Sequence, residues 1–132
     1  MRIRRLRWAW FIGTAFILLI QNAAGSSLSV HAIRLISGAP YYYPVQATVV
    51  TGQPIEWINQ TASPHTVTHL GCMDGSGQCA FDSGTLAPGG RFSVYFLPPG
   101  RYPYRCRLHP IMEGMLTVQE PVHMTTIQAQ RP

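Results

Sequence analysis

Charged side chains are scarce in this chain of 132 residues, since Asp, Glu, Lys and Arg together make up only 11% of it. Hydrophobic residues make up 46%, and this balance excludes a long disordered tail or a coiled coil. Strong net charge is also lacking beyond residue 25: four of the ten basic residues lie in the first seven positions, which leaves six basic against five acidic residues. A region so close to neutral lacks the electrostatic attraction that nucleic-acid binding needs.

Long apolar stretches are missing as well. The longest, Trp8–Ile20, has 13 residues, whereas a helix needs about 20 to span a bilayer. The basic segment Met1–Arg7 precedes it and the small residues Ala23-Ala24-Gly25 follow it, which is the pattern of a secretory signal peptide. We interpret residues 1–25 as a signal peptide and residues 26–132 as one domain, exported to the periplasm or another extracytoplasmic space. The alternative is a retained N-terminal anchor, which would hold the protein at a membrane.

Cysteine is rare, with three residues in the chain. Cys72 and Cys79 bracket the segment Met-Asp-Gly-Ser-Gly-Gln, whose turn-forming residues can bring its two ends together. In an oxidising compartment this pair is expected to close as a disulfide, which leaves Cys106 alone. A lone thiol is a liability in an exported protein unless something binds it, so Cys106 is the first candidate functional residue.

No segment after residue 25 has apolar residues at helical spacing for three turns, whereas short runs with a period of two are frequent. The 12 glycines and 11 prolines indicate many turns between them. We expect strands at 32–36, 46–51, 55–59, 65–70, 91–97, 102–106 and 116–118. They predict an all-β sandwich of seven to eight strands, whose core includes the aromatic residues Trp57, Phe92, Phe96, Tyr102 and Tyr104.

A thiolate, an imidazole and a thioether lie within seven residues, at Cys106, His109 and Met112. His65 lies about forty residues upstream, directly after Pro64. One Cys and two His in a trigonal arrangement, with a weak axial Met, form the ligand set of blue-copper sites. Sulfur ligands favour Cu(I) and imidazoles suit both oxidation states, so such a site can gain and lose an electron with little change in geometry. The pattern therefore predicts one copper ion that cycles between Cu(I) and Cu(II).

The same residue types also allow other interpretations that do not involve copper. Cys106 could be a buried structural thiol, and a structural zinc site would have to recruit the loop cysteines as further ligands. His69 shares its strand parity with His65 and is either a solvated histidine or an auxiliary ligand. No His-x-His pair is present, which excludes the trinuclear centre of multicopper oxidases. Four protein donors leave no open position, so the pattern predicts neither an enzyme nor a small-molecule substrate.

Several segments match one family. The stretch from Gly52 to Val118 resembles the cupredoxins, and the plastocyanin and amicyanin group in particular, in Gly52–Asn59, Pro64–Val67, Phe81–Gly84, Gly100–Cys106 and the Cys-x-x-His-Pro-x-Met loop. The resemblance implies a Greek-key β-sandwich with one mononuclear type 1 copper site at one end. It also implies a monomeric electron carrier that serves a donor and an acceptor protein, with the electron leaving through the exposed edge of His109.

The resemblance also bears on the axial ligand, because Met112 lies three residues after His109, as in amicyanin. Met115, at plus six, is then a core residue or a neighbour of the ligands. Two features depart from the family. Thr66 stands where the relatives usually carry Asn, so the hydrogen bonds around the ligand loop are expected to differ. The Cys72–Cys79 loop is an insertion, either a stapled hairpin or part of a partner surface.

The function and the role of three arginines each have two possible interpretations. A copper-binding module for copper delivery or resistance, in which the metal is cargo, is the alternative function. Arg101, Arg105 and Arg107 are either solvated or form a basic rim that attracts an acidic redox partner.

Overall fold

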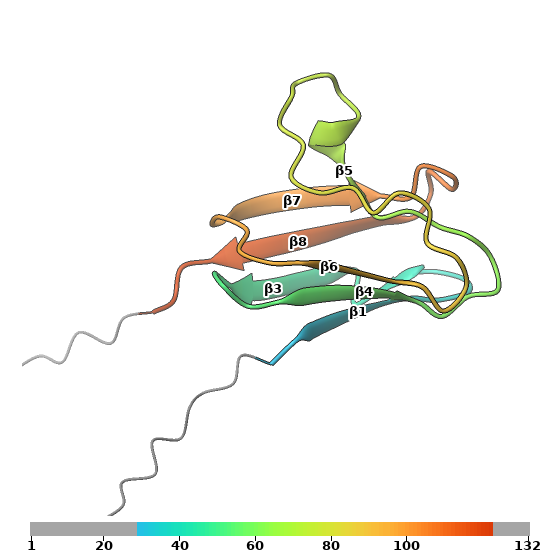
Figure 1. The fold of residues 1–132 in the computed structure, drawn as a ribbon, viewed down its shortest axis with the longest axis horizontal. Coiled ribbons are helices and arrows are strands. Elements are labelled where there is room, and N and C mark those ends of the chain that lie inside the picture. Colours follow the sequence, from blue (N-terminus) through green and yellow to red (C-terminus); the bar gives the residue numbers. More distant parts are fainter. Residues whose placement is uncertain (1–28, 123–132) are drawn as a thin grey trace, which may run out of the picture.

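The computed structural model describes residues 29–122, which form eight strands and one short 3-10 helix (Figure 1). The predicted signal peptide at residues 1–25 lies outside the described residues. In chain order the elements are β1 (His31–Leu35), β2 (Tyr42–Tyr43), β3 (Gln46–Val50), β4 (Ile55–Asn59), β5 (Thr68–His69), η1 (Leu70–Cys72), β6 (Arg91–Val94), β7 (Gly100–Arg105) and β8 (Glu113–Gln119).

The strands form two sheets of four, in the orders β2-β1-β4-β6 and β3-β8-β7-β5. β1 pairs in parallel with β4, and β3 with β8, whereas the other pairs are antiparallel. The predicted all-β sandwich of seven to eight strands is confirmed. No helix within residues 29–122 is long and apolar enough to cross a membrane.

Trp57 on β4 lies at the centre of the core and is fully buried. Its ring packs against Phe81, Phe92 and Tyr104, with centroid distances of 5.3, 5.8 and 5.6 Å. Tyr104 on β7 lies opposite Gly114 on β8, where a Cβ atom would overlap the tyrosine ring. The two sheets therefore pack against each other through one aromatic cluster. Glycine at position 114 leaves room for the ring of Tyr104 in this cluster.

The expected strand at 91–97 is shorter than predicted, because β6 ends at Val94. Phe96 adopts a backbone φ of 57° and its side chain is 78% exposed. The chain must leave one sheet here to enter β7 in the other, and the left-handed conformation at Phe96 turns its side chain to solvent. The prediction that Phe96 belongs to the core was wrong. The expected extended run at 65–70 is also interrupted, since only Thr68–His69 forms a strand and Leu70 begins η1.

The two ends of the sandwich differ. β7 runs toward the segment 106–112, which connects it to β8 at the right of Figure 1. The described chain enters at His31, whose N–H donates to Pro54 O, and leaves after Gln119, whose carbonyl accepts the Thr51 N–H. The start of β1 and the end of β8 thus lie at the opposite end, to the left in Figure 1.

Candidate metal centre

Three side chains that the sequence singled out meet at the end of β7. The ligand atoms of His65, Cys106 and His109 all lie within 4.8 Å of one another. Cys106 Sγ is 3.8 Å from His65 Nδ1 and 3.6 Å from His109 Nδ1, and the two imidazole centroids are 4.8 Å apart. One soft and two borderline donors thus converge, although they are separated by up to 44 positions in the chain.

The loop that carries Cys106 and His109 is closed by its own backbone. The Cys106 N–H donates to Met112 O at 3.0 Å, and the Met112 N–H donates to His109 O at 2.9 Å. These bonds fold the seven residues into a tight turn between β7 and β8, which holds the thiol and the imidazole on one side.

His65 comes from a different part of the fold. It forms an isolated antiparallel bridge with Leu86, in which each N–H donates to the carbonyl of the other. The buried Asn59 holds both sides of this bridge, because its Nδ2 donates to Ser63 O at 2.8 Å and to Leu86 O at 3.0 Å. The sequence did not predict that Asn59 holds this bridge, because its position indicates only the end of a strand.

Three of the four side chains at the centre are buried. Cys106 is fully buried, Met112 is 2% exposed and His65 is 7% exposed, whereas His109 is exposed. The apolar side chains of Leu108 and Ile111 flank it and also face solvent. His109 is therefore the point at which the centre meets the surface.

The imidazole of His65 is in the state that a metal ligand requires. Burial, and then the neighbouring His109, lower its pKa below the ordinary value of 6.5. Both effects disfavour the protonated ring. At neutral pH His65 is therefore neutral and has a free nitrogen lone pair.

The two candidate methionines lie in different surroundings. Met112 lines a cavity together with His65, His109 and Tyr41. Met115 lies on β8 opposite Pro103 and lines a separate hollow with Val45. The structure brings Met112, and not Met115, to the cavity of the imidazoles.

Thr66, directly after His65, makes two hydrogen bonds to the loop that carries Cys106. Its N–H donates to Cys106 Sγ at 3.2 Å, and its hydroxyl accepts the Arg107 N–H at 2.8 Å. The sequence predicted different hydrogen bonds around Thr66, because the relatives usually carry Asn at this position. It could not predict the two partners, since they depend on how the segment after His65 packs against the loop after Cys106.

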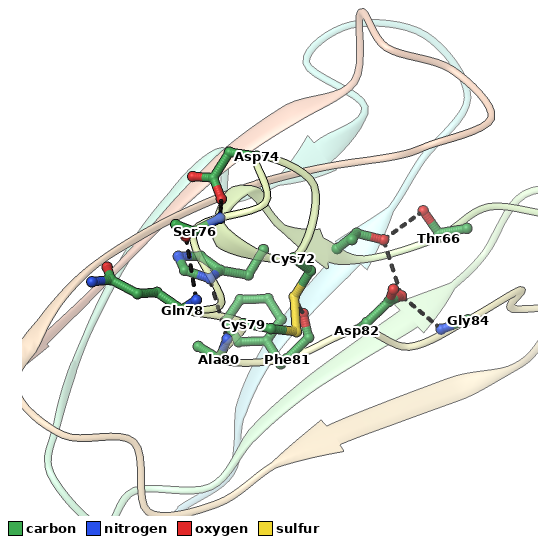
Figure 2. The surroundings of a disulfide bond; sticks show 12 residues. Thr66, Cys72, Asp74, Ser76, Gln78, Cys79, Ala80, Phe81, Asp82 and Gly84 are labelled. Atoms are coloured by element: carbon green, nitrogen blue, oxygen red, sulfur yellow. Dashed lines mark hydrogen bonds between the residues drawn. A yellow bond between two sulfur atoms is a disulfide. The ribbon is translucent and has the colours of Figure 1, made fainter.

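The predicted disulfide between Cys72 and Cys79 is present (Figure 2), which leaves Cys106 as the free cysteine. The loop is also held by local hydrogen bonds, with Asp74 Oδ1 accepting the Ser76 N–H at 2.9 Å. His69 Nδ1 accepts the Ala80 N–H at 3.3 Å, so His69 closes this loop and is not part of the ligand group.

Of the three arginines that are either solvated or form a basic rim, Arg105 and Arg107 line one hollow together with Cys106. Arg101 lies four residues before Arg105 on β7, about 13 Å away along the strand. The Arg107 guanidinium lies 3.4 Å from Asp82 Oδ2, so its charge has a partner within the chain.

Comparisons with known proteins identify relatives that are copper-binding proteins. Residues 32–119 match the sequence model of the family described as copper binding proteins, plastocyanin/azurin family. The chain is 30% identical over 78 residues to amicyanin of Paracoccus denitrificans, which covers 59% of this chain and 58% of amicyanin. It is 32% identical over 89 residues to plastocyanin of Scenedesmus fuscus, which covers 63% of this chain and 91% of plastocyanin. The chain thus spans less than two thirds of the amicyanins that it matches.

A solved structure is similar over the same region. The novel purple cupredoxin from Nitrosopumilus maritimus superposes with a TM-score of 0.57 at 29% identity, covering 67% of this chain and 99% of the other.

Proposed function

Because the chain belongs to the plastocyanin/azurin family of copper-binding proteins, we propose that it carries single electrons on one copper ion held by His65, Cys106 and His109. The observation that carries the proposal is the convergence of these three donors with only His109 at the surface.

The spacing of the donors fits a metal. Metal–imidazole and metal–thiolate bonds of about 2.0–2.3 Å, at angles between tetrahedral and trigonal, separate nitrogen from sulfur by about 3.6–3.8 Å. The two distances from Cys106 Sγ to the imidazole nitrogens are 3.6 and 3.8 Å. Met112, which lines the cavity of the two imidazoles, would supply a weak sulfur donor as the fourth ligand.

The donor set favours copper over structural zinc. A zinc site with four Cys and His ligands would need one more beside His65, Cys106 and His109. Cys72 and Cys79 are joined to each other, and among the described residues no other Cys or His belongs to the group. A thiolate with two imidazoles and a thioether is the set that suits both Cu(I) and Cu(II).

Bound copper would supply reversible one-electron chemistry. The protein holds its ligands ready before the metal arrives, since the loop from Cys106 to Met112 is closed by backbone hydrogen bonds. Burial of Cys106 keeps water from the thiolate, and the Thr66 N–H partly neutralises its charge. With the donors fixed in this way, little has to move when the charge of the centre changes.

Electrons pass through the edge of His109 to a partner protein. Leu108 and Ile111, 50% and 74% exposed, provide an apolar contact surface around it. Because the other donors are buried, a partner cannot easily take the metal itself, which argues against the delivery of copper as cargo. The disulfide supports work outside the cytoplasm, where such bonds persist.

Loading the metal-free protein with Cu(II) tests the proposal. We expect one equivalent of copper, an intense visible absorption from the thiolate–copper bond, and reversible one-electron cycling. Cys106→Ser should lose the visible absorption and remain folded, whereas Cys72→Ala/Cys79→Ala should keep it. A colourless copper protein, or one that releases Cu(I) to an acceptor faster than it exchanges electrons, would show that the delivery function is correct.

A further inference from the structure

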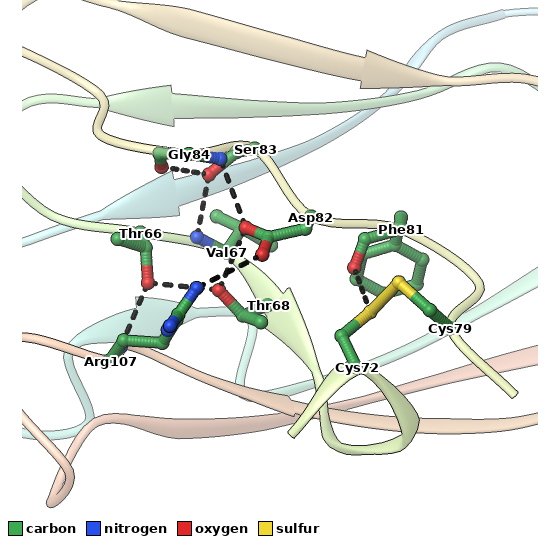
Figure 3. A network of polar contacts seen from close by, with 10 residues as sticks. All are labelled: Thr66, Val67, Thr68, Cys72, Cys79, Phe81, Asp82, Ser83, Gly84 and Arg107. Atoms are coloured by element: carbon green, nitrogen blue, oxygen red, sulfur yellow. Dashed lines mark hydrogen bonds and ion pairs between the residues drawn. A yellow bond between two sulfur atoms is a disulfide. The ribbon is translucent and has the colours of Figure 1, made fainter. Parts of the chain in front are cut away.

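A line of polar contacts extends from the metal loop through the protein to Asp82 (Figure 3). It starts at the Arg107 N–H, which donates to the Thr66 hydroxyl at 2.8 Å. The Thr68 hydroxyl lies 3.1 Å from the Thr66 hydroxyl and 3.1 Å from Asp82 Oδ1. Thr66 and Thr68 are buried, at 4% and 0% exposure, so the line crosses the interior before it reaches the carboxylate.

The direction of the hydrogen bonds follows from the groups involved. Each hydroxyl carries one proton, and a carboxylate can only accept. Thr68 therefore donates to Asp82, which leaves its oxygen free to accept from Thr66. The Thr66 oxygen in turn accepts from the Arg107 amide. Every proton in the line then points toward the negative charge.

Asp82 is itself held in place. Its Oδ1 also accepts the Gly84 N–H at 3.0 Å, and Asp82 forms an isolated bridge with Thr68. The carboxylate is thus a fixed charge at the far end of the line.

We propose that Asp82 is a positioning residue for the metal centre, acting through Thr68 and Thr66 on the Cys106–Arg107 peptide. Hydrogen bonds in a buried chain polarise one another, and those that end on a charge are the stronger ones. Asp82 makes the Thr66 oxygen a better acceptor for the Arg107 amide. This bond fixes Thr66, whose own N–H lies on Cys106 Sγ at 3.2 Å.

A second route from Asp82 to the loop is weaker. Asp82 Oδ2 is 3.4 Å from the Arg107 guanidinium, with side-chain exposures of 29% and 60%. Exposed pairs of this kind contribute little. The inner line through the two threonines therefore carries the effect, and variants can separate the two routes.

Amide hydrogen exchange in the metal-free protein tests the line without copper. In Thr68→Val and in Asp82→Asn we expect the protection of the residue 107 amide to fall, about tenfold in Thr68→Val, which lacks the hydroxyl altogether. Thr68→Ser, which restores the hydroxyl, should recover it. Arg107→Gln, which removes only the outer ion pair, should leave the protection of this amide near its original value. Glu56→Gln is the matched control, because it breaks the Arg91–Glu56 ion pair in the other sheet.

The reduction potential of the copper-loaded protein is the second readout, and this part rests on the proposed function. A hydrogen bond to the thiolate weakens its donation to Cu(II), so a loosened Thr66 should lower the potential in Thr68→Val and not in Thr68→Ser. If the protein bound no copper, the exchange experiment would still decide the role of Asp82. Unchanged protection at residue 107 in Asp82→Asn would overturn the proposal, even if Thr68→Val lost protection, as would an Arg107→Gln variant that lost as much protection as Asp82→Asn.

Discussion

Single residues decide how the centre is completed. Met112 and Met115 are three positions apart, yet the first lines the cavity of the imidazoles and the second faces Pro103 on the outside of a sheet. The difference arises because Met112 closes the metal loop, whereas Met115 already belongs to β8.

We expect Met112→Gln to bind copper through the same imidazoles and thiolate and to change both the visible spectrum and the reduction potential, because the proposed fourth donor changes from sulfur to oxygen. Met115→Gln is the matched control and should leave both unchanged. Absorption spectroscopy and voltammetry of the two loaded variants provide the comparison. If the spectrum responded to position 115 and not to position 112, the axial assignment would be incorrect.

Among the elements of the fold, the loop closed by the Cys72–Cys79 disulfide lies outside the two sheets. It leaves the fold after β5 through η1 and rejoins it at Phe81, whose carbonyl accepts the His69 N–H. None of the four proposed ligands lies in it. Its contribution is therefore expected in stability rather than in the properties of the copper.

Replacing both cysteines in Cys72→Ala/Cys79→Ala should lower the free energy of unfolding by about 2–3 kcal/mol, since a short loop loses its covalent closure. Urea unfolding of the metal-free protein measures this loss, and the spectrum of the loaded variant should match that of the parent. A changed spectrum with intact folding would mean that the loop supports the ligands.

The elements also show what the sequence could predict. Period-two runs located the long strands, because alternation is a local signal. Residue types and their spacing singled out His65, Cys106 and His109, which the structure brings together. The two-residue strand β2 and the early end of β6 were missed, since pairing and chain direction in the sandwich decide them. The line from Thr66 to Asp82 was missed as well. Thr66 and Asp82 lie in two matched motifs and Thr68 lies directly after the first, but only tertiary packing determines which hydroxyl meets which amide.

For the molecule as a whole, the core contains two tyrosines that resist ionisation. Tyr42 and Tyr104 pack with their centroids 5.0 Å apart. Burial raises the pKa of Tyr104 to about 12, and it raises the pKa of Tyr42 further. Tyr42 also donates its hydroxyl proton to Thr66 O at 2.7 Å, so its ionisation would break a bond next to the centre.

Stability should therefore fall in alkali. Unfolded tyrosines ionise near pH 10, whereas the folded protein keeps both protons, so above pH 10 the unfolded state binds fewer protons and the free energy of unfolding decreases with pH. Tyr104 alone accounts for about 2 kcal/mol by pH 12. Urea unfolding of the metal-free protein between pH 8 and 12 measures the slope, which should be shallower in Tyr104→Phe. A wild-type curve that stays flat above pH 10 would contradict this expectation.

The segment 106–112, which carries His109, lies at one end of the sandwich, and both ends of the described chain lie at the other. A linker attached beyond residue 122 would consequently leave the imidazole edge unobstructed. If the protein were immobilised on a gold surface through such a linker, its partners in solution could still reach His109, whereas adsorption through Leu108 and Ile111 would bring the copper to the metal surface instead. The two orientations should differ in the rate of interfacial electron exchange.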